Sequence, residues 1–171
     1  IDDELSSYET IWESSVFKST DKDHRRVITA LKNICADDAD SESLAESMDV
    51  DNILRYMAVQ TFVVNLDSLS GSMANNYYLY EEDGKLNLIP WDYNLAFATY
   101  PLGMSAPLTD AETLINYPID TPLMRTSMEE RPVFSELMKE ADCLRQYHEY
   151  LAALHGGYFS SGRFETMVKV W

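Results

Sequence analysis

The amino-acid sequence predicts an α+β protein that is predominantly helical and carries one small β-hairpin. Two observations support this class. Apolar residues recur at helical spacing near both ends of the chain. Between these regions, alternating residues flank an Asp-Gly pair, which is the pattern of a hairpin. Because 171 residues fit one domain, we expect a single domain over residues 1–171.

The composition indicates a folded protein with a strongly acidic surface. Apolar residues make up 46% of the chain, and the formal net charge is −16. Acidic surfaces repel nucleic-acid phosphates and anionic lipid, and no apolar run is long enough to span a bilayer. We therefore expect no nucleic-acid partner and no membrane insertion. Cys35 and Cys143 lack a metal-binding spacing. Two buried thiols are expected, with one disulfide as the alternative.

The helices of the first half follow from apolar spacing. Residues 21–34 predict an amphipathic helix behind an acidic opening. A short helix is expected around Leu44–Met48. Asp49 or Asp51 then caps a long helix over residues 50–66, which is apolar nearly all round and is expected to form the centre of the core.

A polar loop and a hairpin follow the long helix. Residues 65–76 are rich in Asn, Asp, Ser and Gly, which favour loop geometry. The hairpin strands are expected over Tyr77–Tyr80 and Leu86–Ile89, with a turn at Asp83 and Gly84.

The remainder of the chain predicts one irregular segment and three helices. Residues 98–123 contain four prolines and read as a long irregular segment. The first helix then begins at Pro132, the second spans residues 141–157 and stops at a glycine pair, and the third covers residues 160–171.

Three oxygen-bearing side chains are expected to meet at one end of the hairpin. Asp67 lies in the loop after the long helix, Asn76 ends that loop, and Asp92 follows the second strand. A hairpin returns the chain close to its start, so the three should face a common space. Two carboxylates and an amide suit Mg²⁺ or Mn²⁺ and leave positions for phosphate oxygens. Protein kinases use an acid, an amide and a second acid in this order.

Each of these residues also has a purely structural interpretation. Asp92 could be a turn residue, although burying its carboxylate between Trp91 and Tyr93 without a partner would be costly. Asp67 could be an ordinary loop residue after a helix, and Asn76 could merely shape the loop. The spacing of Asp67 and Asn76 does not decide, because it is wider than the spacing in kinases.

The stretch NLDSLSGSMANNYYLYEEDGKLNLIPWDYNLAF, residues 65–97, resembles the core signature of the CotH family of spore-coat-protein-H-like atypical kinases. The family pattern has Asn-x-Asp, a His-Asn-Tyr-Tyr-Leu-Tyr strand, an acidic Gly turn and Pro-Trp-Asp. The chain departs from this pattern at Asn75, where the family usually has His, and at Ala98, where Gly is common. Residues 117–123 and 131–154 resemble the downstream region of the family.

This resemblance implies a fold like the C-terminal lobe of a protein kinase and transfer of the ATP γ-phosphate to Ser or Thr of a protein. It implies that Asp67 holds the catalytic-acid position and that Asp92 binds the metal. Asn76 is implied to bind the metal and nucleotide or to order the loop. The implied cofactors are ATP and Mg²⁺ or Mn²⁺, and the implied substrate is a protein, such as a coat or surface protein.

The resemblance also implies a location in the spore coat, on the cell surface or outside the cell. The lobe that brings the phosphate-pairing lysine is expected to be absent from this chain. The chain alone is therefore expected to fold, to bind Mg-ATP weakly or not at all, and not to transfer phosphate. The alternative function is a non-catalytic coat or adhesion module with the same fold.

Overall fold

The computed structural model describes residues 1–100, 110, 112–113 and 116–170. The helical elements are η1 (Leu5–Tyr8), α1 (Glu9–Glu13), α2 (Asp21–Ile34), α3 (Ser41–Ser47), α4 (Val50–Phe62), α6 (Pro132–Lys139), α7 (Ala141–Leu154), η2 (His155–Phe159) and α8 (Arg163–Val170). The strands are β1 (Tyr77–Glu82) and β2 (Lys85–Pro90), which form one antiparallel sheet. A mostly helical α+β fold with one hairpin is thereby confirmed.

Side-chain caps determine where α2 and α3 begin. The Thr20 hydroxyl accepts a hydrogen bond from the Asp23 amide, and the Asp23 carboxylate accepts one from the Thr20 amide. Asp40 and Ser43 form the same reciprocal pair at α3. These capping boxes satisfy amides that have no partner within the first helical turn. Both predicted helices are present, and α3 begins at Ser41, earlier than the sequence indicated.

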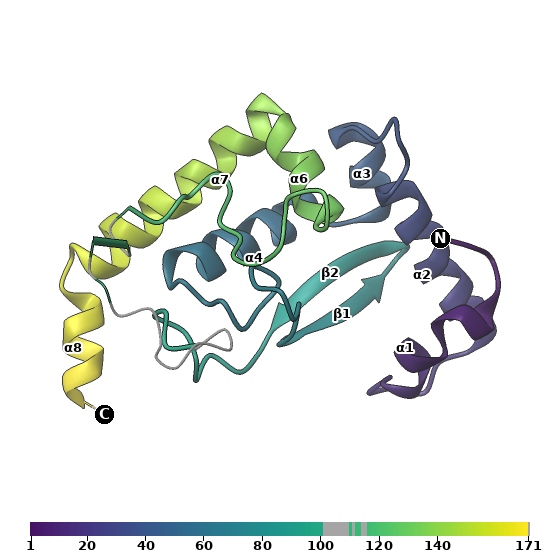
Figure 1. The fold of residues 1–171 in the computed structure, drawn as a ribbon, viewed down its shortest axis with the longest axis horizontal. Coiled ribbons are helices and arrows are strands. Elements are labelled where there is room, and N and C mark those ends of the chain that lie inside the picture. The colour runs from purple at the N-terminus through teal and green to yellow at the C-terminus, as the bar shows by residue number, and fades with distance from the viewer. Residues whose placement is uncertain (101–109, 111, 114–115, 171) are drawn as a thin grey trace.

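Helix α4 forms the centre of the core, as its apolar sequence predicts, and it contacts α3, α6, α7 and β2 (Figure 1). Asp49 caps it by accepting a hydrogen bond from the Asn52 amide. The helix ends at Phe62, earlier than predicted, and Val64 has a positive φ of 45°. The buried core residues are Ala30, Ile34, Leu44, Met48, Ile53, Leu54, Tyr56, Met57, Ala58, Leu69, Leu86, Leu88, Phe134, Leu137, Cys143, Tyr147 and Leu151.

The hairpin has the predicted turn. Asp83 and Gly84 have φ values of 52° and 85°, as a two-residue turn with two left-handed positions requires. Leu86 and Leu88 of β2 are buried in the core. The hairpin therefore attaches to the helical layer through one face of β2.

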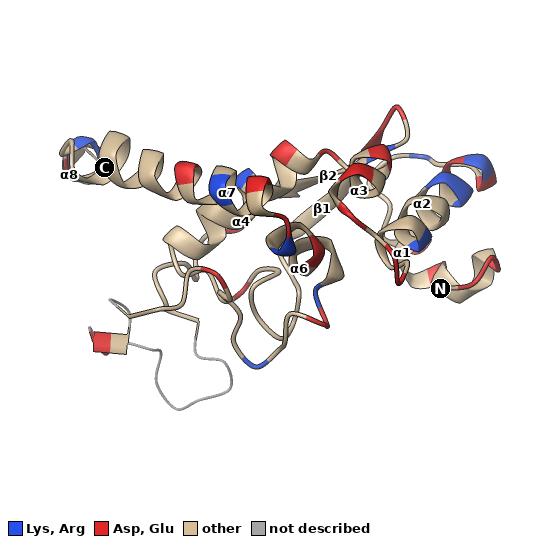
Figure 2. Ribbon diagram, turned by 90° about the horizontal axis from the view of Figure 1, so that it is seen from above, with Lys and Arg blue, Asp and Glu red and all other residues tan. Residues whose placement is uncertain are grey.

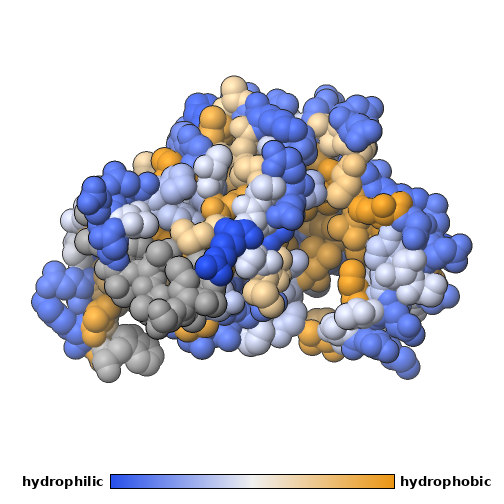
Figure 3. All heavy atoms as spheres, in the orientation of Figure 1, coloured by the Kyte–Doolittle hydropathy of each residue, from blue (hydrophilic) through white to orange (hydrophobic). Residues whose placement is uncertain are grey.

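The opposite face of the hairpin is exposed. Figure 3 shows hydrophobic side chains at the surface beside the hairpin. The exposed large residues on this face are Tyr78, Tyr80, Ile89 and, just beyond β2, Trp91. The rings of Tyr78 and Trp91 stack with centroids 5.7 Å apart. An aromatic surface thus lies next to the residues that end the hairpin.

The C-terminal helices match the sequence except at the glycine pair. Helix α6 begins at Pro132, which has no amide hydrogen to leave unpaired. The helical conformation does not end at Gly156 and Gly157 but continues through them as the π-helical turn η2. Helix α8 is present as predicted. Residues 101–109, 111 and 114–115 of the predicted irregular segment lie outside the described residues.

The N-terminal end of the molecule contains the predicted helix α2 together with elements that were not predicted. Helices α1 and α2 lie at one end and α8 at the opposite end (Figure 1). The short elements η1 and α1 were not predicted, because they contain no buried residue and therefore no apolar periodicity.

Basic residues are interleaved with acidic residues on the helices (Figure 2). On α2, Arg26 pairs with Asp23 and with Glu81 of β1. On α7, Arg145 pairs with Asp142 and Glu149 in the same way. These pairs reduce the attraction of either helix for a polyanion.

Both cysteines are free thiols. Cys143 is buried, as expected, whereas Cys35 is exposed. The expectation of two buried thiols is therefore wrong for Cys35, which directly follows the last residue of α2. Within the part of the chain that the structure describes, no helix has the length and apolar character needed to cross a bilayer.

Candidate functional site

The loop between α4 and β1 brings Asp67 and Asn76 into contact. The Asn76 side-chain amide, Nδ2, donates to Oδ2 of Asp67 at 2.7 Å and to the Asp67 backbone carbonyl at 2.8 Å. The Asp67 amide donates to Oδ1 of Asn65 at 3.3 Å. The first and last parts of the loop are thus joined through the Asp67 carboxylate.

Strand pairing places the residue before Asp92 next to Asn76. The register pairs Tyr77 with Pro90, so Asn76 and Trp91 face one another just beyond the hairpin. There the Trp91 amide donates to the Asn76 carbonyl oxygen at 3.3 Å. Asp92 follows directly, with a φ of 54°.

The charge of Asp92 acts on Asp67. Burial raises the pKa of Asp67 above its usual value, the hydrogen bond from Asn76 lowers it, and the negative charge of Asp92 raises it further. Asp92 itself is exposed, as are Trp91 and Tyr93. The cost of burying the Asp92 carboxylate between the two rings therefore does not arise, and interest in Asp92 rests on the effect of its charge on Asp67.

Left-handed backbone is concentrated around these residues. Asn76 has a φ of 61°, which Asn and Asp tolerate better than other residues with a Cβ atom. Phe97 and Ala98 have φ values of 57° and 56°. Ala98 occupies the position where the sequence resemblance favours Gly, and its methyl group makes this conformation costly. Its amide is bonded to the Val64 carbonyl at 3.0 Å.

The loop is held from outside by Arg131, which precedes α6. Its Nε donates to the Leu69 carbonyl at 2.8 Å, and its Nη2 donates to the Gly71 carbonyl at 2.6 Å. Gly71 has no alternative, because a Cβ atom there would lie 1.8 Å from the Leu66 carbonyl oxygen. Sequence analysis assigned no role to Arg131. In the sequence, the glycine within the polar loop was the one local sign that this loop is closely packed.

The donor set fits a hard cation that is shared with phosphate. Asp67, Asn76 and Asp92 offer oxygen atoms, which Mg²⁺ and Mn²⁺ prefer. Over the described ranges, no group of three or more His, Cys, Asp or Glu is placed to hold a metal by itself. Mg²⁺ is commonly bound through one or two carboxylates together with phosphates of a substrate. Two acids and one amide suit a cation that is bound partly by the protein and partly by the phosphates of a substrate.

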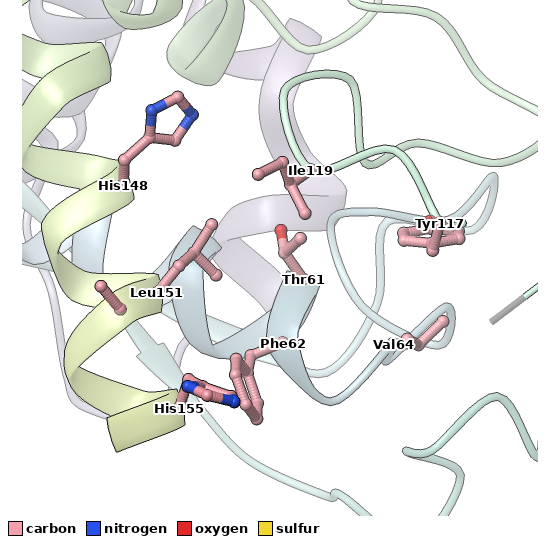
Figure 4. Close-up of a pocket in the computed structure, with 9 residues that line it drawn as sticks. Thr61, Phe62, Val64, Tyr117, Ile119, His148, Leu151 and His155 are labelled. Carbon is pink, nitrogen blue, oxygen red and sulfur yellow. The ribbon is translucent and has the colours of Figure 1, made fainter. Parts of the chain in front are cut away.

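A separate cavity of about 430 Å³ lies beside the C-terminal end of α4 (Figure 4). Its lining residues are Thr61, Phe62, Val64, Tyr117, Ile119, His148, Leu151, Ala152 and His155. His148 and His155 project from the α7–η2 segment, and His148 is bonded to Asp120 at 2.5 Å. Asp67, Asn76 and Asp92, hereafter the acid–amide residues, are not part of this lining. Sequence analysis did not predict this cavity, because its walls come from distant segments.

The family model for CotH kinase protein matches residues 2–171. The chain belongs to the CotH kinase protein family. Neither the comparison with curated proteins nor the comparison with solved structures gave a match. The segment that suggested this family from the sequence alone contains Asp67, Asn76 and Asp92. In it, Asn76 bonds to Asp67, and the charge of Asp92 acts on Asp67.

Proposed function

We propose that this CotH-family chain carries the phosphoryl-transfer residues of a protein kinase that moves the γ-phosphate of ATP to Ser or Thr of a protein. The observation that carries the proposal is the contact of Asn76 with Asp67 beside Asp92. An acid, an amide and a second acid serve as base and metal ligands in kinases. A kinase-like C-terminal lobe as the overall architecture is part of the same proposal.

Asp67 is the proposed proton acceptor for the substrate hydroxyl. Its Oδ2 accepts the hydrogen bond from Asn76, and we assign its Oδ1 to the hydroxyl. The raised pKa of Asp67 makes its carboxylate a stronger base than an ordinary Asp. Asn76 holds the carboxylate in one orientation, which is the main contribution a protein makes to phosphoryl transfer.

Asp92 and Asn76 are the proposed ligands of the cation. The Asn76 amide serves two partners, because its nitrogen bonds to Asp67 and its oxygen is assigned to the cation. Asp92 supplies an exposed carboxylate at a left-handed turn, where nucleotide phosphates can approach. A bound Mg²⁺ or Mn²⁺ neutralises the charge of the phosphates and of the two acids.

The test is transfer of radiolabelled phosphate from ATP to a Ser-rich protein by the full-length protein. We expect Asp92→Asn and Asp67→Asn each to lower transfer by about 10²- to 10⁴-fold. Asp83→Asn is the matched control, because it removes an acid at a left-handed position in the hairpin turn. Asp92→Asn with the activity of the control would overturn the proposal.

The competing proposal is a non-catalytic module for contacts in a spore coat or on a cell surface. The exposed aromatic face of the hairpin, with Tyr78 stacked on Trp91, favours it. Under that proposal no form transfers phosphate, and Trp91→Ala weakens attachment to coat or surface protein while Asp92→Asn does not. Under the kinase proposal the protein substrate comes from the same coat or surface setting.

A further inference from the structure

A chain of side-chain hydrogen bonds crosses the interior between the Asp67 and Asp92 segments. Asn65 Nδ2 donates to Oε1 of Gln60 at 2.9 Å, and Gln60 Nε2 donates to the Tyr93 hydroxyl at 3.0 Å. At the other end, the Asp67 amide donates to Oδ1 of Asn65 at 3.3 Å. We propose that Gln60 and Asn65 are positioning residues that set the place of Asp67 relative to Asp92. This inference rests on the function proposed for the two acids.

Burial shows that this chain of bonds is a built feature. Gln60 and Asn65 are both 0% exposed. A buried amide destabilises a protein unless its donor and acceptor groups are bonded. Gln60 lies on α4 among apolar core residues, so an apolar residue of similar size would pack there without that requirement. A buried polar network with its bonds made favours one arrangement over others.

The connections to the two acids are short. Tyr93 directly follows Asp92, so a displacement of the Tyr93 side chain reaches Asp92 through one peptide unit. Asn65 lies two residues before Asp67 and bonds to its amide. The segment with Asp67 and the segment with Asp92 are thus both connected by hydrogen bonds to the side chain of Gln60 on the central helix.

Backbone bonds tie the same segments at a second place. The Phe97 amide donates to the Val63 carbonyl at 2.6 Å, and the Ala98 amide donates to the Val64 carbonyl at 3.0 Å. These bonds lie five and six residues beyond Asp92, and they keep the segments together when the side-chain bonds are removed. Variants of Gln60 or Tyr93 should therefore fold, with the acids less well aligned.

The experiment compares Gln60→Met and Tyr93→Phe in the full-length protein. Met keeps the volume of Gln and removes both bonds, whereas Phe removes one hydroxyl. We expect kcat to fall by about 10- to 100-fold in Gln60→Met and by less in Tyr93→Phe, with KM for ATP changed less than about threefold. The double variant should resemble Gln60→Met alone, because both changes break the same chain of bonds.

The matched control is Tyr117→Phe, which removes a partly buried hydroxyl bonded to the Pro122 carbonyl at 3.0 Å. It should lose similar stability and keep kcat. If Gln60→Met lowers kcat no more than Tyr117→Phe does, the positioning role is wrong.

Amide hydrogen exchange gives a readout that does not depend on phosphate transfer. In Gln60→Met, exchange should accelerate at Asp67 and at residues 93–98, while α7 keeps its protection. Uniform acceleration over the whole molecule would overturn the inference. If the wild type transfers no phosphate but the local acceleration occurs, the kinase proposal fails and the linkage between the two segments stands.

Discussion

The capped helices α2 and α3 differ in backbone conformation from the two acid-bearing segments, which are the loop with Asp67 and the segment that follows Asp92. Each capped helix begins with a reciprocal capping box. In residues 1–62, all of which the structure describes and none of which is glycine, no residue has a positive φ. Between residues 64 and 98, by contrast, left-handed positions outside the hairpin turn are Val64, Ala74, Asn76, Asp92, Phe97 and Ala98. Energetically unfavourable left-handed backbone conformations thus cluster beside the candidate site, as is typical of functional regions.

This difference teaches that the loop and the Asp92 segment are held by their surroundings rather than by local preference. The supports come from α4, from Arg131 before α6 and from the packing around Gly71. Removing a support should therefore change the acid-bearing segments far more than an equivalent change elsewhere. The following predictions test that statement, from the largest expected effect to the smallest.

Gly71→Ala should have the largest effect on stability. The added methyl group would meet the Leu66 carbonyl oxygen at 1.8 Å, so the backbone must move. We expect a loss of roughly 3 kcal/mol or more, measured by urea unfolding. Gly157→Ala is the control, because a Cβ atom there meets nothing within 4 Å. Because Gly157 has no positive φ, its replacement should leave stability unchanged or raise it by up to about 1 kcal/mol. Equal effects would show that the loop is not tightly packed.

Arg131→Met should destabilise the loop by about 2 kcal/mol, because two backbone carbonyls lose a charged donor. Hydrogen exchange should accelerate first in residues 68–74. Arg145→Met removes an exposed arginine with two ion pairs and should cost less than about 1 kcal/mol. A larger loss for Arg145→Met than for Arg131→Met would contradict the assigned support.

Ala98→Gly and Ala96→Gly should have effects of opposite sign. Both alanines are buried, but only Ala98 has a positive φ, at 56°. Glycine at 98 relieves the left-handed conformation and should stabilise the fold by up to about 1 kcal/mol. Glycine at 96 adds chain entropy to the unfolded state and should destabilise by about 1 kcal/mol. Thermal unfolding of the two variants measures the contrast, and destabilisation at both positions would refute it.

Asp67→Asn should raise the melting temperature at pH 7 by roughly 1–4 °C. The folded-state pKa of Asp67 is raised, so the folded protein binds more protons than the unfolded chain between the ordinary pKa and the raised pKa. Stability therefore falls as pH rises through that window and stays lower above it. Asn removes this penalty, and its advantage should vanish near the ordinary Asp pKa. Asp37→Asn, at an exposed position, controls for net charge. Equal gains in both variants would contradict the prediction.

The sequence predicted elements whose signals are local. The acidic opening with Asp21 and Asp23 indicates the start of α2, and Asp83 with Gly84 indicates the hairpin turn. Once the hairpin is known, the meeting of Asn76 with the Asp67 loop follows from chain geometry. The irregular end of α4 could not be predicted, because a β-branched residue such as Val64 rarely adopts a positive φ.

The supports of the site depend on contacts between distant residues. Arg131 reaches Leu69 across 62 positions, and Gln60 reaches Tyr93 across 33. No local pattern encodes such pairs. A polar Gln inside an apolar helix was the one available hint, since a buried amide needs partners.

The central claim is that the acid–amide residues bind a divalent cation with nucleotide, and paramagnetic broadening by Mn²⁺ tests it most directly. Mn²⁺ with a non-hydrolysable ATP analogue is titrated into the ¹⁵N-labelled 171-residue chain. The account predicts early and strongest broadening at the amides of Asp67, Asn76 and Asp92, and loss of that effect in Asp92→Asn. Broadening that is equally strong at the exposed acids Asp37 and Asp38, and unchanged in Asp92→Asn, would contradict it.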